Sequence, residues 1–227
     1  MQALLYTLAP VLAVVIGAII ASRTKLNPGL VAGLQHLAAG VVFAAAATEI
    51  LPQVKHEASP SATLIGGAAG VVTMLGLKAF EARFKGPMAL LAAIGIDILV
   101  DGLVLGLAFV AGEKAGFLLT IALTLEVLFL GLTLTNELAE TYRSRLRIIV
   151  IVSALALLPI GALAAVPVAT LSPVMVAGFL SFGLMALLYL VTEELLVEAH
   201  EKPDTPLISS MFFVGFLALL TLEEIMG

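Results

Sequence analysis

The sequence contains no cysteine and no tryptophan, and few of its side chains are charged. Without cysteine, the 227-residue chain has no disulfide and offers no thiolate to a metal. Charged residues make up 12% of the chain and hydrophobic residues 61%, and the mean hydropathy is +1.17. This composition is too apolar for an ordinary soluble domain. We therefore expect an integral membrane protein, in which the position of each charge is informative.

Apolar stretches of bilayer-spanning length recur along the whole chain, each close to the ~20 residues that a spanning helix needs. The first stretch lacks a basic leader and a convincing cleavage signal, so we interpret it as a retained helix. The predicted fold is all-α, a single transmembrane domain over residues 1–227 with eight helices. The sixth helix is interrupted by Pro159, Gly161 and Pro167. The expected helices cover residues 3–22, 29–52, 61–80, 88–111, 116–139, 148–166, 173–198 and 207–226.

The basic residues fall almost entirely on one side of the expected membrane. With eight crossings, only Lys55 and Lys114 of the 11 basic residues lie on the other side. The positive-inside rule assigns the basic side to the cytoplasm. Both termini are then expected outside, in a multi-pass protein of the cell (inner or plasma) membrane. The cytoplasmic set is Arg23, Lys25, Lys78, Arg83, Lys85, Arg143, Arg145, Arg147 and Lys202.

A short signature in the second span recurs in the seventh. Thr48, Glu49 and His56 reappear as Thr192, Glu193 and His200. The number of residues between each residue and its counterpart is the same in all three cases, and we call this spacing the repeat offset. The second and seventh spans cross the predicted membrane in opposite directions, so the repeated units would be inverted, as in many secondary transporters. This predicts a 3+2+3 arrangement, with inverted triplets on either side of a central fourth and fifth helix.

Acidic residues interrupt the two central spans. Asp97 and Asp101 lie four residues apart, on one face of a helix, and Glu126 lies in the middle of the next span. Ionised carboxylates at this depth are costly unless they are neutralised, and every Lys and Arg lies in or beside a loop. A bound cation or protons would supply the countercharge. Together with Glu194, these residues offer a divalent ion oxygen ligands, which suit relatively hard ions. The adjacent Glu193 is a further candidate ligand.

Other polar residues have less specific interpretations. Glu126, Thr133 and Glu137 share one stripe of the fifth span and form a candidate exit track. Glu49, Glu193 and Glu194 lie near helix ends, where an interfacial role is equally expected. His36 near the start of the second span is expected to bond to backbone or headgroups. His56 and His200 are expected in loops, where either could assist metal capture.

The pattern resembles the ZIP (Zrt/Irt-like) family of divalent-metal transporters over essentially the whole chain. The resemblance lies in the second span, residues 36–41 (HLAAGV) leading into 49–52 (EILP), and in the seventh, residues 189–195 (YLVTEEL) followed by 198–200 (EAH). It implies eight helices, both termini outside, inverted triplets and a metal site built on the fourth and fifth helices. Glu194 matches that family's metal-binding glutamate of the seventh helix.

The fourth and fifth spans depart from the family pattern. The fourth-helix signature His-Asn-x-x-(Asp/Glu)-Gly is here DILVDG, residues 97–102, and the fifth-helix His-Glu-x-Pro-Glu-Gly is EVLFLG, residues 126–131. Asp97 and Glu126 thus replace the two histidines, while Asp101 is kept. This favours one metal ion over two. It also shifts the expected cargo from zinc toward manganese, iron(II) or another hard divalent ion.

The predicted function is transport of a divalent metal cation by alternating access, with the ion as substrate and no cofactor. One alternative is a proton- or cation-coupled transporter of a small solute. Another is a non-transporting membrane relative. An enzyme is not expected, since no nucleophile–base pair is visible. The expected partners are the metal ion and the lipid bilayer, with no nucleic acid. The run of alanines from Ala44 to Ala47 would allow helix packing within one protomer or in a homodimer.

Overall fold

The computed structural model describes residues 2–24, 27–56, 59–83, 87–137, 155–201 and 205–227. Within these ranges nearly all residues are helical and none forms a strand, which confirms the predicted all-α class. The elements are α1 (Gln2–Tyr6), α2 (Leu8–Arg23), α3 (Pro28–Ala45), η1 (Ala46–Ile50), α4 (Leu51–His56), α5 (Pro60–Arg83), α6 (Pro87–Ala111), α7 (Glu113–Glu137), α9 (Leu157–Ala164), η2 (Val166–Thr170), α10 (Pro173–Tyr189), η3 (Leu190–Leu195), α11 (Leu196–His200) and α12 (Pro206–Met226).

Proline defines where several helices begin. It occupies the first position of α3, α5, α6, α10 and α12, where its missing N–H is not needed and its fixed φ suits the helix. Two of these starts are also capped by the preceding residue. The Asn27 side chain accepts a hydrogen bond from the Gly29 N–H at 2.9 Å, and the Thr205 hydroxyl accepts one from the Ile208 N–H at 3.3 Å.

Seven helices of the described residues are long and apolar enough to cross a membrane. They coincide with seven of the eight expected stretches, so the chain is a multi-pass membrane protein by the length and composition of its helices. The sixth stretch, 148–166, lies in part outside the described residues. Its described portion contains α9 and then the short 3-10 segment η2, which carries Pro167.

Polarity is distributed as expected for a protein surrounded by lipid. Large apolar side chains such as Leu64 (73% exposed) and Leu207 (78%) face outward, whereas Asp101 (4%) and Glu126 (5%) are buried. In water this distribution would leave apolar surface exposed and carboxylates desolvated. In a bilayer the outward side chains face acyl chains, and the buried carboxylates are the anomaly that needs a functional explanation.

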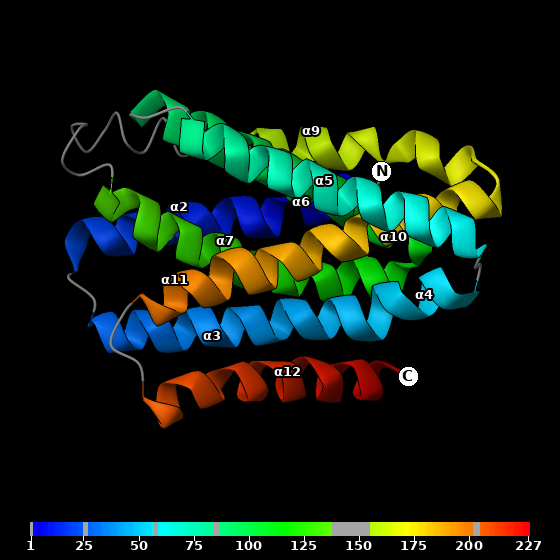
Figure 1. Ribbon diagram of the computed structural model, residues 1–227. Helices are drawn as coiled ribbons and strands as arrows, with labels where there is room; N and C mark the ends of the chain where they lie inside the picture. Colours follow the sequence, from blue (N-terminus) through cyan, green and yellow to red (C-terminus); the bar gives the residue numbers. More distant parts are fainter. Residues whose placement is uncertain (1, 25–26, 57–58, 84–86, 138–154, 202–204) are drawn as a thin grey trace.

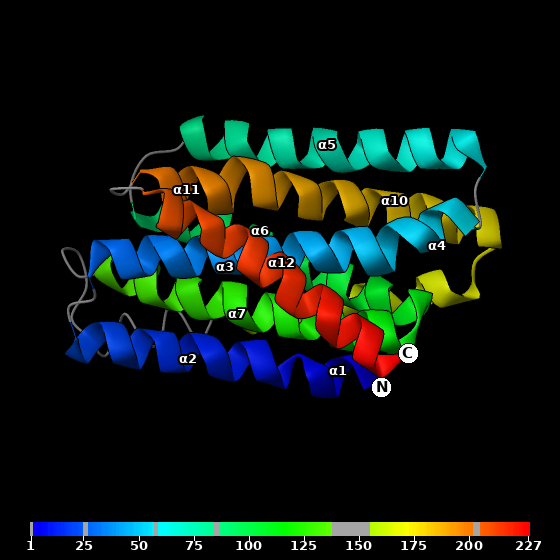
Figure 2. The ribbon, with the colours of Figure 1, turned by 90° about the horizontal axis from the view of Figure 1, so that it is seen from below.

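The helices pack as a bundle in which four pairs make the most extensive contacts: α2 with α7, α6 with α9, α3 with α12, and α5 with α10. The central helices α6 and α7 also contact each other, and α3 and α10 pack against α7 and α6, respectively. Figures 1 and 2 show the first and last described residues at the same end of the bundle. The starts of α3 and α12 and the end of α11 lie at the opposite end.

Three of these pairs, α6–α9, α2–α7 and α3–α12, are held by reciprocal contacts between glycines and backbone carbonyls. A Cβ on Gly102 of α6 would lie 2.0 Å from the Leu158 carbonyl oxygen of α9, and one on Gly161 of α9 would lie 2.1 Å from the Leu99 oxygen. Only glycine allows such close helix approach.

The α2–α7 pair repeats this arrangement at residues related by fixed spacings in the sequence. Gly17 of α2 precedes Gly161 of α9 by the repeat offset, the spacing that separates Glu49 from Glu193. Gly131 of α7 follows Gly102 of α6 by a second, shorter spacing, called the central offset below.

The close contacts themselves follow both offsets. A Cβ on Gly17 would lie 2.3 Å from the Leu128 oxygen, and one on Gly131 would lie 2.5 Å from the Val14 oxygen. The repeat offset also relates Val14 to Leu158, and the central offset relates Leu99 to Leu128. The same glycine–carbonyl contacts therefore recur between two pairs of helices.

Two π-helical segments are related by the repeat offset as well. The first, η1, begins at Ala46, and the second, η3, begins at the equivalent position, Leu190. A π-helical turn accommodates an extra residue and is often found at functional sites. Glu49 lies in the first segment and Glu193 in the second, so the sequence repeat coincides with a repeat of unusual backbone geometry.

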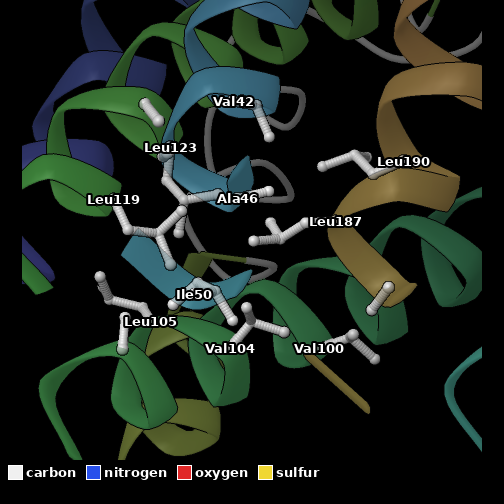
Figure 3. Packing of buried hydrophobic residues seen from close by; sticks show 14 of the residues in the cluster. Val42, Ala46, Ile50, Val100, Val104, Leu105, Leu119, Leu123, Leu187 and Leu190 are labelled. Atoms are coloured by element: carbon white, nitrogen blue, oxygen red, sulfur yellow. The ribbon is translucent and has the colours of Figure 1, made fainter. Parts of the chain in front are cut away.

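The apolar core lies where both π segments meet the central helices. Side chains from α3 and η1, α6, α7, and α10 with η3 converge there, as Figure 3 shows, among them Val42, Ile50, Val104, Leu123 and Leu187. This packing fixes the relative positions of α6, α7 and η3, which carry the acidic residues singled out in the sequence.

Candidate functional site

The two aspartates of α6 differ in exposure. Asp101 is 4% exposed, and its Oδ2 atom has no hydrogen-bond partner among the described residues. Asp97, one helical turn earlier, is half-buried. A buried carboxylate with an oxygen left without a partner costs several kcal/mol when ionised. Asp101 is therefore unfavourable for folding in the absence of a ligand or proton.

Glu126 of α7 is the second deeply buried carboxyl group. It is 5% exposed, and its Oε2 atom also has no hydrogen-bond partner in the described part of the chain. Because α6 packs on α7, Glu126 lies within range of electrostatic repulsion from both Asp97 and Asp101. The three carboxyl groups thus lie on two helices that pack against each other.

The π segment η3 determines which of the two adjacent glutamates reaches this cluster. Glu194 is half-buried and interacts electrostatically with Asp101 and Glu126. Glu193 is exposed and lies apart, lining a different, open pocket. Its carbonyl oxygen accepts a hydrogen bond from the Lys78 ammonium group at 3.2 Å. Of the two candidate ligands in the seventh span, the structure thus places only Glu194 with the central carboxylates.

A small cavity of about 40 Å³ is lined by three of these carboxyl groups, those of Asp97, Glu126 and Glu194, whereas Asp101 is not among its described lining residues. A single water needs roughly 10–15 Å³ measured in this way, so the space is sufficient for an ion with part of its hydration shell. The described lining includes acidic, amide and apolar residues but no basic side chain. It consists of Gln35, Asp97, Glu126, Phe129, Leu130, Leu190, Glu194, Leu195 and Glu198.

Two lining residues, Gln35 and Glu198, were not singled out from the sequence. The Gln35 amide of α3 donates a hydrogen bond to Oε2 of Glu198 in α11 at 2.7 Å. Glu198 follows Glu194 by one turn, and this i, i+4 spacing was the available signal. These residues extend the polar lining from the central carboxylates toward the end of the bundle opposite the termini (Figure 1).

The carboxyl groups do not form a closed coordination shell. Among the described residues, no three Asp, Glu, His or Cys side chains are close enough to hold one metal ion. An ion in the cavity would therefore bind through one or two carboxylates, with water completing its shell, unless the side chains moved closer. Mg²⁺-like binding of this kind suits hard ions that retain water.

The predicted exit track along α7 is only partly described. The hydroxyl group of Thr133 donates to the backbone carbonyls of Phe129 at 3.1 Å and Leu130 at 3.3 Å. The side chain of Glu137 lies outside the described residues. The described polar path instead follows Glu194 and Glu198.

Glu49, in η1, has a separate environment. It is 8% exposed, and its Oε1 atom has no hydrogen-bond partner among the described residues. The charged groups of Lys114 and Glu223 act on it electrostatically, and these two residues form an ion pair at 2.6 Å between α7 and α12. Glu49 is thus more buried than a solvated helix-end residue.

Comparisons with known proteins add no assignment. No protein-family model matches the chain. A search of curated proteins finds no match to the sequence either. A functional interpretation therefore depends on the residues and the geometry described above.

Proposed function

We propose that the protein is a membrane transporter of divalent metal cations, related to the ZIP family and using Asp97, Asp101, Glu126 and Glu194 as ion-binding residues. The observation that carries this proposal is the convergence of carboxyl groups from three helices on one small cavity without a basic side chain among its described lining residues. Such an arrangement is costly unless cations or protons neutralise it.

Carboxylate oxygens favour hard divalent ions such as Mn²⁺, and iron(II) and zinc are further candidate substrates. The described cavity offers no imidazole. We therefore expect Mn²⁺ and iron(II) to be carried at least as well as Zn²⁺.

The repeated contacts support an inverted-repeat transporter with eight spans in a 3+2+3 arrangement. The repeat offset relates the two π segments and also relates α2 to α9, while the central offset relates α6 to α7. Asp97 and Glu126 are themselves separated by the central offset, which makes them counterparts across the central pair. In such transporters the substrate site lies near the repeat interface, and relative movement of the helix groups alternates its access.

An even number of spans is also supported by the position of the two ends of the chain at one end of the bundle (Figure 2). With the basic loops in the cytoplasm, both termini would then face outward.

The test is ion influx into proteoliposomes containing the purified protein. Mn²⁺, iron(II), Zn²⁺ and Cd²⁺ are compared for the wild type, Asp101→Asn and Glu224→Gln, a control at an exposed acidic residue of α12. We expect influx for the wild type and the control, and a loss of at least tenfold for Asp101→Asn. Absence of influx for all metals would overturn the proposal. A proton-dependent solute flux insensitive to metals would favour the coupled-solute alternative instead.

A further inference from the structure

One acidic residue singled out in the sequence, Glu193, has no part in the acidic cavity. Its side chain is exposed, although it belongs to the apolar helical stretch Pro173–His200. A carboxylate on the outer face of a membrane-spanning segment is unfavourable unless a group of opposite charge accompanies it. The surroundings of Glu193 therefore indicate which ligand this face of the protein accepts.

The position of Glu193 along this stretch places it close to the headgroup region of the bilayer. The 28 residues of the stretch extend over about 42 Å, whereas the hydrocarbon core is about 30 Å thick. With the stretch centred in the membrane, about 6 Å of helix passes beyond the hydrocarbon at each end. Glu193 precedes the end of the stretch by about two turns, or about 10 Å, so it lies only a few Å below the hydrocarbon boundary.

A lysine of α5 lies beside Glu193 without pairing with its carboxylate. The Lys78 ammonium group donates a hydrogen bond to the backbone carbonyl oxygen of Glu193 at 3.2 Å. Both side chains are exposed, and within the described part of the chain they form no ion pair with each other. An ammonium group and a carboxylate are thus held side by side, each able to accept a ligand group of opposite charge.

An apolar groove leads from these two charges toward the middle of the membrane. It has a volume of about 380 Å³ and lies between α10 with η3 and the peripheral helix α5, which packs mainly on α10 (Figure 2). Both helices run toward the end of the bundle opposite the termini (Figure 1). The lining residues Val71 and Met185, which precede Lys78 and Glu193, therefore lie nearer the bilayer centre. The groove has the polarity of a phospholipid, with charges toward the membrane surface and apolar side chains toward its centre.

The size of the groove favours a single extended acyl chain over the helix of a second copy. One turn of an α-helix, with a diameter of about 10–12 Å and a pitch of about 5.4 Å, occupies about 400–600 Å³. The groove is smaller than that, whereas a slender hydrocarbon chain can lie along its apolar walls.

The two charges distinguish between phospholipid headgroups. Phosphatidylethanolamine carries a phosphate and a primary ammonium group, which complement Lys78 and Glu193, respectively. The net negative headgroup of phosphatidylglycerol would satisfy Lys78 but would be repelled by the Glu193 carboxylate. The quaternary ammonium group of phosphatidylcholine has no N–H, so it cannot donate a charge-assisted hydrogen bond to that carboxylate.

We propose that the groove between α5 and α10–η3 binds a phospholipid with an ethanolamine headgroup, whose ammonium group pairs with Glu193 and whose phosphate pairs with Lys78. One acyl chain packs along Val71, Leu75 and Met185. Consecutive residues of η3 thereby serve different ligands, since Glu193 binds the lipid and Glu194 lines the acidic cavity. The lipid site does not depend on which ion the protein transports.

The test is native mass spectrometry of the full chain in detergent, with phosphatidylethanolamine, phosphatidylcholine and phosphatidylglycerol of identical acyl chains added in turn. We expect the wild type to retain phosphatidylethanolamine about fivefold more strongly than either of the other two. Glu193→Gln and Lys78→Met should each remove this preference. Glu224→Gln and Lys55→Met are the matched controls at exposed positions outside the groove, and both should keep it.

Glu193→Lys provides a result that loss of folding cannot imitate. It places two ammonium groups at the headgroup and should transfer the preference from phosphatidylethanolamine to phosphatidylglycerol. An unaltered preference in Glu193→Lys, or equal retention of all three lipids by the wild type, would contradict the proposal. A dimer that Glu193→Gln dissociates would assign the groove to a second copy of the chain instead.

Asp101→Asn separates the lipid site from the transport function. This variant should abolish Mn²⁺ influx and keep the preference for phosphatidylethanolamine. Mn²⁺ influx by a wild type without lipid preference would refute only the lipid site. Lipid preference without influx of any metal would refute only the transport function.

Discussion

At the scale of single residues, the acidic cluster is a feature retained at the expense of stability. Asp101 and Glu126 are both buried, and each has a carboxylate oxygen without a hydrogen-bond partner among the described residues. Sites of this kind store unfavourable free energy that a ligand can recover on binding. Removing the charge of one of these carboxylates should therefore impair ion binding without lowering the stability of the metal-free protein.

Asp101→Asn should be at least as stable as the wild type in the absence of metal, because it removes a desolvated charge while keeping the side-chain volume. The variant should also lose stabilisation by Mn²⁺, which raises the unfolding temperature of the wild type by binding the folded state. Thermal loss of helical circular dichroism is the suitable measurement, since the chain has neither tryptophan nor a thiol for dye assays. A marked drop in the metal-free unfolding temperature would indicate a structural role for Asp101.

At the scale of secondary-structure elements, the π segments determine which side chains face the cavity. Consecutive helical residues point about 100° apart, so an inserted residue redirects everything that follows it. This explains why residue spacing alone located the seventh span but kept Glu193 as a candidate beside Glu194, which the family resemblance favoured. The sequence revealed the acidic residues of α6 and α7 because charges are rare in apolar stretches. Gln35 was missed because its role depends on a contact with Glu198, which is distant in the sequence.

The adjacent glutamates of η3 provide a matched pair of substitutions. Glu194→Gln should reduce Mn²⁺ influx at least tenfold, because Glu194 lines the cavity with Asp97 and Glu126. Glu193→Gln should retain most of the wild-type influx, because its side chain is exposed in another pocket. Initial rates in proteoliposomes, normalised to incorporated protein, measure both. Equal loss in the two variants would mean that Glu193 reaches the ion during the transport cycle.

The close helix pairs are the second feature at this scale, and they predict a position-dependent effect of glycine substitution. Gly161→Ala should destabilise the protein by about 1–3 kcal/mol or more, because the new methyl group meets the backbone of α6. Gly76→Ala in α5 has no atom within 4 Å of the new Cβ and should be neutral or stabilising by up to about 1 kcal/mol. Thermal unfolding followed by circular dichroism compares them. A similar unfolding temperature for both variants would contradict the close α6–α9 contact.

At the scale of the whole molecule, the repeated scaffold and the functional site have different symmetry. The glycine–carbonyl contacts recur between the two helix pairs, yet the repeat counterpart of Glu194 is Ile50, which is 1% exposed and belongs to the apolar core. The repeat therefore builds the frame, while acidic residues on one side of it build the cavity. The recurring polar residues of the second and seventh spans revealed the repeat offset in the sequence. That Gly17 and Gly161 are also counterparts could be recognised only from the close helix contacts that both glycines make.

Opposite orientation of the two halves, with eight crossings, predicts which loops are accessible from outside the cell. The natural absence of cysteine allows single-cysteine variants without background labelling. Ser61→Cys, at the start of α5, should react with a membrane-impermeant maleimide on intact cells. Ser22→Cys, at the end of α2, should react only after permeabilisation. It lies on the side of the membrane that carries the basic loops, which the positive-inside rule places in the cytoplasm. Both serines are exposed in the structure, so accessibility reports sidedness. Labelling of Ser22→Cys but not Ser61→Cys on intact cells would invert the topology, and with it the expected direction from the acidic cavity to the cytoplasm.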